Sequence, residues 1–325
     1  MFKTRITELL GIQYPVIGGT MMYLSYPELT AAISEAGALG ILASANYKQM
    51  PQFRDALKQT KDLTDKPFAV NLNMFPAIQQ ADNNLYLDEM EREGIKIVET
   101  SGHKAPDDLV GRIHDAGMLL IHKCVAPRYA RKAESVGVDA VAVVGWENGG
   151  ATGVLDLATS ILIPRTVDSV SLPLIGGGGV GDGRGLAAML ALGADAAIIG
   201  TLLLSAEEAK IHPRVREELI RLQEHETTLI LRSLHNTHRV ADTEVAHKVQ
   251  QMEEEQADIE QLLPLISGAK SQALWQDGNL DAGVLWLGQA VGFIKEIRPI
   301  KVLIEEMAQQ AEQSLKRMRG LFGAD

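Results

Sequence analysis

The sequence predicts an α/β protein built as a (β/α)8 TIM barrel with a helical insertion and C-terminal helices. Three observations support this fold. Short apolar runs that suit buried strands recur through the first two hundred residues, and segments with helical periodicity lie between them. Two glycine-rich turns come late in this repeat. Strands that alternate with helices are parallel, and eight of them close into a barrel rather than an open sheet.

Each expected strand begins after a helix-ending glycine or at a proline. We expect strands at residues 15–19, 38–42, 67–72, 95–98, 118–121, 140–144, 173–176 and 196–199. Helical periodicity marks residues 27–36, 51–61, 106–116 and 127–136, each with a proline in its first turn. The first two hundred residues therefore supply both layers of a barrel.

The chain changes character after Thr201. Residues 212–266 are charged and helical in pattern, with no strand signal, and residues 278–294 are expected to form a helix of small residues. An amphipathic helix is expected from Ile300 to about Leu321. We expect three units: a ligand-binding (β/α)8 barrel at 1–210, a helical lid at 211–280 over the barrel mouth, and a final barrel helix and C-terminal helix at 281–325.

Composition narrows the classes of function. The chain of 325 residues is 46% hydrophobic with only 5% aromatic residues, which is typical of soluble α/β proteins. No apolar run suits a membrane span or a signal peptide, so we expect a cytoplasmic protein with no membrane partner. The single cysteine, Cys124, leaves no internal disulfide, and no metal is expected. A net charge of −11 argues against nucleic acid as a partner. We expect a monomer or a homodimer.

Residues 173–185 run from an apolar strand into a turn rich in glycine, with Asp182 as the expected N-cap of the following helix. A second unit follows, in which a short strand ends at Gly200 and Thr201. Two such turns near the end of a barrel predict a phosphate site, because glycine lets backbone N–H groups approach an anion. The alternative is that these glycines only form tight turns.

The expected strand ends offer one cation, Lys123, several amide and backbone donors, and no cluster of carboxylates. This set disfavours a two-carboxylate glycosidase and a divalent-metal site. It suits a planar ligand with a phosphate tail, such as FMN, with Asn71 and Lys123 bonding its polar edges. Alternatives stay open: Asn71 caps a loop, and Lys123 forms a simple ion pair. His122 points opposite to Lys123, which favours a core histidine.

Several motifs resemble those of the nitronate monooxygenase (2-nitropropane dioxygenase) family of FMN-dependent TIM-barrel oxidoreductases. They lie at residues 68–72, 121–124, 149–153, 177–185, 192–196 and 200–201, while residues 211–215 and 232–240 most resemble the NADH:quinone reductase branch. The resemblance implies phosphate contacts at Gly178, Gly179, Gly200 and Thr201, supported by Gly288 and Gln289. It implies ring and ribityl contacts from Gly19, Thr20, Met21, Asn71 and Lys123.

One departure from the family pattern concerns catalysis. Ala151 occupies the position where the family carries a histidine, so the catalytic residue is unknown from the sequence. Candidates to replace it are His122, His103 and His238, with His235 also in the lid. Without a replacement, the protein is expected to use an anionic nitronate far better than a neutral nitroalkane, because only the neutral compound must first lose a carbon proton.

The expected function is FMN-dependent oxidation of alkyl nitronates with O2. One alternative is an NAD(P)H:quinone or enoyl reductase that uses the same FMN, with NAD(P)H as a co-substrate. Another is a non-catalytic flavin-binding protein. The substrate is in every case a small molecule. In the lid, Arg232 and Arg239 either contact an anionic substrate or nicotinamide phosphate, or pair with lid carboxylates.

Overall fold

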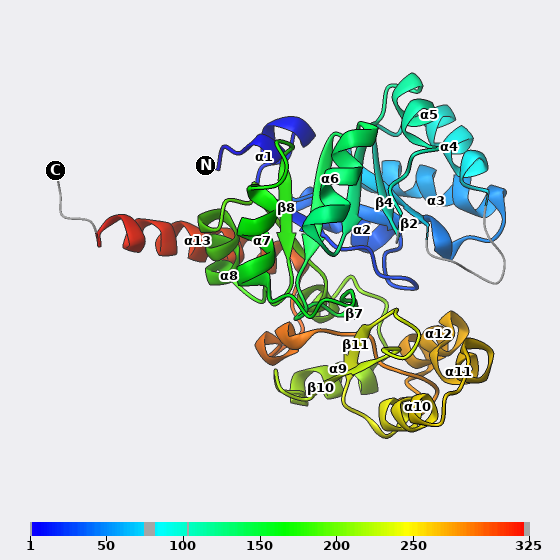
Figure 1. Cartoon of the computed structure of the whole chain (residues 1–325). Helices are drawn as coiled ribbons and strands as arrows, with labels where there is room; N and C mark the ends of the chain where they lie inside the picture. The colour runs from blue at the N-terminus through cyan, green and yellow to red at the C-terminus, as the bar shows by residue number, and fades with distance from the viewer. Residues whose placement is uncertain (1, 75–81, 103, 322–325) are drawn as a thin grey trace.

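Eight parallel strands form the centre of the molecule (Figure 1). The computed structural model describes residues 2–74, 82–102 and 104–321. The strands are β1 (Val16–Gly18), β2 (Gly40–Ala43), β3 (Phe68–Asn73), β4 (Ile97–Ser101), β5 (Leu119–Cys124), β6 (Ala140–Val144), β8 (Leu174–Gly177) and β9 (Ala196–Ile199). Their order is β1-β9-β8-β6-β5-β4-β3-β2, and a parallel bridge from Ile17 to Leu39 joins the two ends. The predicted (β/α)8 barrel is confirmed.

Helices cover the outside of the barrel. They are α2 (Pro27–Glu35), α3 (Met50–Leu63), α4 (Asn83–Arg92), α5 (Val110–Asp115), α6 (Pro127–Val136), α7 (Thr159–Val167), α8 (Gly183–Ala191) and α13 (Ile300–Arg319). Proline stands in the first turn of α2, α3 and α6, as expected. The α5 helix begins later than expected, because Pro106 opens a turn whose carbonyl accepts hydrogen bonds from Leu109 and Val110.

The short helix α1 (Arg5–Leu10) closes one end of the barrel. Its Ile6 and Leu10 side chains join an apolar cluster of strand residues that includes Ile17, Ile41 and Ile121. Thr4 and Thr7 form a capping box at the start of this helix. Because this end is filled with apolar side chains, a ligand can enter the barrel only from the carboxyl ends of the strands.

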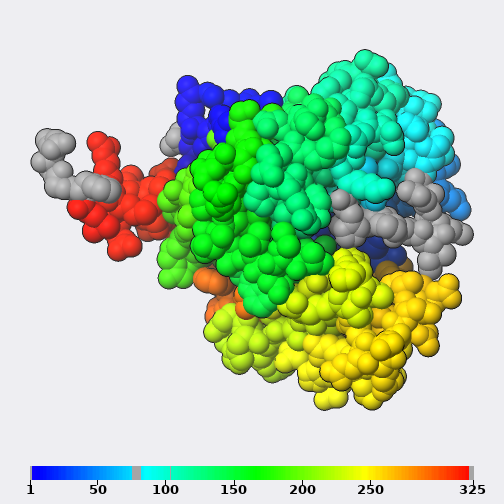
Figure 2. Space-filling view, viewed as in Figure 1, coloured from blue at the N-terminus to red at the C-terminus, as the bar shows by residue number. Residues whose placement is uncertain are grey.

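Residues 211–280, which we call the lid, lie below the barrel in the views of Figure 1 and Figure 2, on the side of the carboxyl ends of the strands. The lid contains α9 (Pro213–Arg221), β10 (Thr227–Ile230), β11 (His238–Ala241), α10 (Glu244–Glu254), α11 (Ile259–Ile266) and α12 (Gly268–Asp277). It has its own apolar cluster, which includes Ile230, Val240, Val249 and Leu262. The part of the lid formed by β10, β11, α10 and α11 is therefore packed around a separate core, whereas Val215 and Leu219 of α9 and Leu274 of α12 belong to the main core cluster.

The expectation that residues 212–266 contain no strand is wrong. Strands β10 and β11 pair antiparallel, and β11 also pairs with β7 (Gly150–Ala151), which belongs to a barrel loop. Both lid strands are only four residues long and lie among charged helices, so their β-branched residues give a weak signal. The resulting three-stranded sheet joins the lid to the barrel.

The expected helix at 278–294 is also wrong. Gly278 ends α12 in the left-handed conformation, and the chain then runs as loop to the short 3-10 helix η3 (Gln289–Phe293). At Gly288 a Cβ atom would lie 2.5 Å from the Glu147 carbonyl oxygen, so this glycine permits close backbone packing rather than helix packing. The expected C-terminal helix is confirmed as α13, which packs on α8 and α2 as the last barrel helix.

None of the described helices combines the length and the apolar composition that a membrane crossing needs.

Candidate functional site

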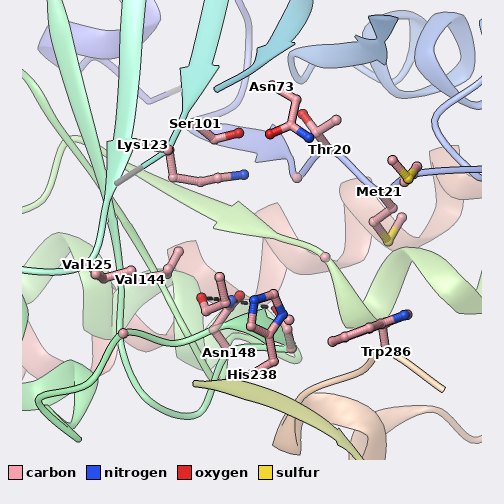
Figure 3. Close-up of a pocket in the computed structure, with 18 of the residues that line it drawn as sticks. Thr20, Met21, Asn73, Ser101, Lys123, Val125, Val144, Asn148, His238 and Trp286 are labelled. Carbon is pink, nitrogen blue, oxygen red and sulfur yellow. Dashed lines mark hydrogen bonds between the residues drawn. The ribbon is translucent and has the colours of Figure 1, made fainter. Parts of the chain in front are cut away.

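A cavity of about 430 Å³ lies between the barrel mouth and the lid, which is within the usual range for small-molecule sites. Barrel residues at strand ends form one wall, and lid residues such as His238 and Trp275 form the other. Figure 3 shows Lys123, Ser101 and Asn73 on one side, facing His238 and Trp286 on the other. The site therefore needs both the barrel and the lid.

A buried carboxylate anchors the polar side of the cavity. The Glu99 side chain is 1% exposed, and its Oε1 lies 3.4 Å from Lys123 Nζ. Asn71 Nδ2 donates a hydrogen bond to Glu99 Oε2, and Thr20 Oγ1 donates to the same oxygen at 3.3 Å. Asn71 Nδ2 also donates to Ser101 Oγ at 3.1 Å. Glu99 thus holds both Asn71 and Lys123 at the cavity wall, and Lys123 forms an ion pair while it lines the cavity.

The strand register explains this grouping. Asn71 of β3 lies opposite Glu99 of β4, and Ser101 of β4 lies opposite Lys123 of β5. Side chains alternate along a strand, so Glu99 and Ser101 share one face while Thr100 and His122 belong to the other. Sequence reasoning missed the part played by Glu99. The signal that could have identified Glu99 is a carboxylate directly after the apolar run 95–98, at a position where the strand continues.

The residues expected to bind FMN fall into two groups. Those that line the cavity are Gly19, Thr20, Met21, Asn71, Lys123, Gly200 and Thr201. Those that do not line it are Gly178, Gly179, Gly288 and Gln289. Gly288 of the second group contacts the first group directly, because its N–H donates to Thr201 Oγ1 at 2.9 Å.

The two glycine turns differ in their surroundings. Gly178 and Gly179 have φ values of 104° and 71°, which favour glycine, and a Cβ at Gly178 would lie 2.5 Å from Thr159 Oγ1. At Gly200 no atom lies within 4 Å of the position of a Cβ. Open space thus adjoins the Gly200 turn, whereas a phosphate contact from Gly178 and Gly179 stays a prediction. Asp182 caps α8 as expected, accepting hydrogen bonds from the N–H groups of Arg184 and Gly185.

The candidate histidines occupy different places. His122 is buried, its Nδ1 lies 2.9 Å from Thr100 Oγ1, and burial lowers its pKa to about 4. It does not line the cavity, which fits a core histidine. His103 lies outside the described residues. His235 and His238 both line the cavity from the lid.

His238 lies directly opposite Ala151 in the pairing of β11 with β7. Its ring contacts the Trp286 ring edge to face, with centroids 5.1 Å apart, and its Nε2 lies 3.3 Å from Asn236 Oδ1. On the neighbouring loop, Asn148 Nδ2 donates to the carbonyl oxygen of Ala151 at 3.2 Å. Ala151 therefore lies beside a histidine from the lid.

The two lid arginines do not line the cavity. Arg232 Nη2 lies 3.0 Å from Asp156 Oδ2, so Arg232 pairs with a carboxylate of a barrel loop and not with one of the lid, as the alternative had it. Arg239 is buried on the opposite face of β11 from His238, with its guanidinium carbon 4.6 Å from the centre of the Trp146 ring. Desolvation lowers the pKa of Arg239. Both side chains connect the lid to barrel loops, and the expectation that they contact a ligand in this cavity is not supported.

Comparisons with known proteins identify the family. The family model described as nitronate monooxygenase matches residues 3–310. The chain is 31% identical to the (3aS,4S,5R,7aS)-5-hydroxy-7a-methyl-1-oxo-octahydro-1H-indene-4-carboxyl-CoA dehydrogenase of Rhodococcus jostii, over 98% of both proteins. It is 25% identical to a probable nitronate monooxygenase of Staphylococcus saprophyticus, over 97% of this chain and 99% of that protein.

Solved structures agree with this assignment. FabK from Thermotoga maritima superposes with a TM-score of 0.91 at 31% identity, covering 99% of this chain and 100% of that one. The nitroalkane oxidase of Streptomyces ansochromogenes gives a TM-score of 0.82 at 24% identity, covering 96% of this chain and 99% of that one, and supports the fold. The chain therefore belongs to the nitronate monooxygenase family and is an oxidoreductase of the flavin-dependent TIM-barrel kind.

Proposed function

We propose that the protein is an FMN-dependent oxidoreductase that oxidises alkyl nitronates with O2. The observation that carries this proposal is the wall of the cavity, where the Lys123 ammonium faces a largely apolar space next to the open turn at Gly200. A cation in such a space attracts an anionic ligand, and a nitronate is already an anion.

The residues present fit FMN. Gly200 and Thr201 border open space, where their backbone can approach a phosphate without a side chain in the way. Gly19, Thr20, Met21, Asn71 and Lys123 form a continuous part of the wall for the ring and the ribityl chain. Gly288 supports this wall through the hydrogen bond from its N–H to Thr201 Oγ1, and Gln289 follows it in the chain.

When bound, FMN supplies a two-electron acceptor and donor. The chain's own residues set the position and the charge of what binds. Lys123 is held by Glu99 and places its positive charge at the cavity wall, where it favours negative charge on a neighbouring group. Asn71 is fixed by Glu99 and Ser101, so its amide is already oriented before a ligand binds.

A second candidate is a reductase or dehydrogenase of acyl thioesters, with NAD(P)H as a possible electron source for the flavin. The mouth of the cavity carries Met22, Val154 and Leu155, which are 41% to 44% exposed. Exposed apolar side chains around a cavity mark a surface that binds an apolar body, and a small alkyl nitronate does not need them. The relatives named as a CoA dehydrogenase and FabK favour the same candidate.

The experiment that tests the proposal is anaerobic rapid mixing, followed by flavin absorbance. Protein loaded with FMN is mixed separately with a nitronate, with NADH, with NADPH and with an acyl thioester, and a mixture with buffer serves as the blank. Bleaching by the nitronate, followed by recolouring with O2, supports the monooxygenase. Bleaching by a nicotinamide, with recolouring by a quinone or an enoyl thioester, supports the reductase.

Two results would contradict the proposal. Protein that takes up no FMN at micromolar concentration would remove the cofactor assignment. Protein that binds FMN but is bleached by none of these compounds would instead be a non-catalytic flavin-binding protein.

A further inference from the structure

We infer that His238, supplied by the lid, transfers the substrate proton in place of the family histidine that Ala151 replaces. This inference rests on the proposed function, because it assigns a residue within the same cavity. It extends the substrate range from preformed nitronates to neutral compounds with an acidic carbon.

The strand pairing carries the inference. His238 and Ala151 are directly opposite residues of the antiparallel pair β11 and β7, and both line the cavity. Directly opposite side chains leave the same face of a sheet, with Cβ atoms roughly 5 Å apart. An imidazole on His238 therefore reaches much of the space that an imidazole on residue 151 would reach.

The surroundings orient the His238 ring. Trp286 packs against it edge to face, and Trp286 itself is fixed by a hydrogen bond from Nε1 to Ser271 Oγ at 2.8 Å. Asn236, whose Oδ1 lies 3.3 Å from His238 Nε2, contacts the ring from within the lid. A general base needs this kind of fixed orientation, since proton transfer depends on geometry first.

The alternation along β11 separates this role from that of the neighbouring cation. Arg239 lies on the opposite face of the strand, against Trp146. The lid strand therefore presents an imidazole, which can be neutral, to the cavity, and it keeps the permanently charged guanidinium out of the cavity. The titratable and charged groups that share the cavity wall with His238 are Lys123, Cys124, Arg128, Tyr129 and His235, with Glu99 behind Lys123. Burial raises the pKa of Cys124 to about 12, so its thiol stays protonated near neutral pH.

The proposed step is a proton transfer without a redox change. The C–H bond next to the nitro or acyl group breaks, and its proton moves to the imidazole nitrogen. The bonding electron pair stays on the substrate, which becomes a nitronate or an enolate, and His238 becomes an imidazolium. Lys123, on the facing wall, is positioned to favour the negative charge that develops.

The test measures this step alone, as the exchange of the acidic carbon hydrogen for deuterium in D2O. Nitroethane and an acyl thioester serve as probes, under anaerobic conditions and with no electron acceptor. Wild-type protein is expected to accelerate the exchange of at least one probe above the buffer rate. The His238→Ala variant is expected to lose roughly 10²-fold to 10⁴-fold of that acceleration, the usual contribution of a positioned base.

Matched variants separate the chemical role from a structural one. His247→Ala removes a lid histidine that pairs with Asp242 and does not line the cavity, and it is expected to leave the exchange rate unchanged. His238→Gln keeps the size of the side chain and a donor for Asn236 but lacks a base, so it is expected to match His238→Ala in exchange while binding FMN like wild type. Moving the histidine across the strand pair, in His238→Ala/Ala151→His, is expected to restore much of the exchange.

The inference would be overturned by wild-type exchange at the buffer rate with both probes, or by His238→Gln exchanging as fast as wild type. Flavin bleaching by a preformed nitronate needs no proton abstraction, so the proposed function can survive either of these results. Conversely, exchange that depends on His238 in a protein that no nitronate or nicotinamide bleaches would preserve the inference and contradict the proposed function.

Discussion

Lys123 Nζ lies 3.4 Å from Glu99 Oε1, and the two side chains differ in exposure: 22% for Lys123 and 1% for Glu99. The carboxylate is fully desolvated, while the ammonium keeps contact with the cavity. A buried carboxylate without a partner destabilises the folded state, so replacing Lys123 alone is expected to be costly.

Replacing Lys123 by methionine is expected to lower the free energy of unfolding by about 3 kcal/mol, the lower end of the range for a broken buried pair, since Lys123 is partly exposed. Denaturant unfolding of the flavin-free protein measures this. The double variant Lys123→Met/Glu99→Gln removes the stranded charge and is expected to recover most of the loss. A double variant no more stable than Lys123→Met alone would show that the pair is not the source of the effect.

Replacing Gly200 by alanine is expected to weaken FMN binding at least tenfold, or about 1.4 kcal/mol, without a comparable loss of stability. A methyl group there meets no protein atom within 4 Å, so it intrudes only on the space assigned to the ligand. Fluorescence titration with FMN measures the affinity. Gly111→Ala, at a second glycine with open surroundings, is the control for adding a methyl group. Equal FMN affinity in Gly200→Ala and wild type would show that the phosphate does not bind at Gly200.

His122 is expected to make the protein less stable as the pH falls from 6.5 to 4. Burial lowers its pKa in the folded state to about 4, so over this range the unfolded state binds the extra proton and the folded state does not. Its contribution is complete above pH 6.5, and about 3 kcal/mol is lost by pH 4. Denaturant unfolding across this range measures the slope. His122→Gln, which can still form a hydrogen bond to Thr100, is expected to reduce the dependence of the free energy of unfolding on pH. An unchanged dependence in this variant would show that other titrating groups cause it.

Asp182→Ala is expected to cost about 1 kcal/mol of stability, because Asp182 accepts hydrogen bonds from two N–H groups in the first turn of α8. Asp182→Asn keeps an accepting oxygen and is expected to cost much less. Thermal unfolding compares the two variants. A full loss in Asp182→Asn would assign the effect to the charge, through the ion pair of Asp182 with Arg184, rather than to the cap.

The barrel could be predicted because its signals are local. A glycine or proline marks the start of each strand, and strands β6 and β9 match the predicted ranges at both ends. The cavity residues Asn71 and Lys123 followed from their places near the carboxyl ends of β3 and β5, where a barrel carries its site. Both predictions depend only on residues that are close together in the sequence.

The lid sheet and Glu99 could not be predicted in this way. Strand β7 is two residues of a barrel loop, and its partner β11 comes much later in the chain, so neither segment alone carries a strand pattern. The role of Glu99 depends on the register that brings Asn71 and Lys123 beside it from two neighbouring strands. Long-range pairing decides both features, and no local pattern encodes it.

The pairing of β11 with β7 places a further demand on the length of the chain that connects β10 to β11. Because neighbouring residues of a strand face opposite sides, the loss or gain of one residue before His238 would shift the strand by one position. The permanent cation of Arg239 would then enter the cavity on the wall that faces Lys123, and the imidazole of His238 would lie against Trp146. Relatives that share this chemistry should therefore keep the length of the segment 231–237 even where its residues differ, and a one-residue deletion there should silence the enzyme while the barrel still folds.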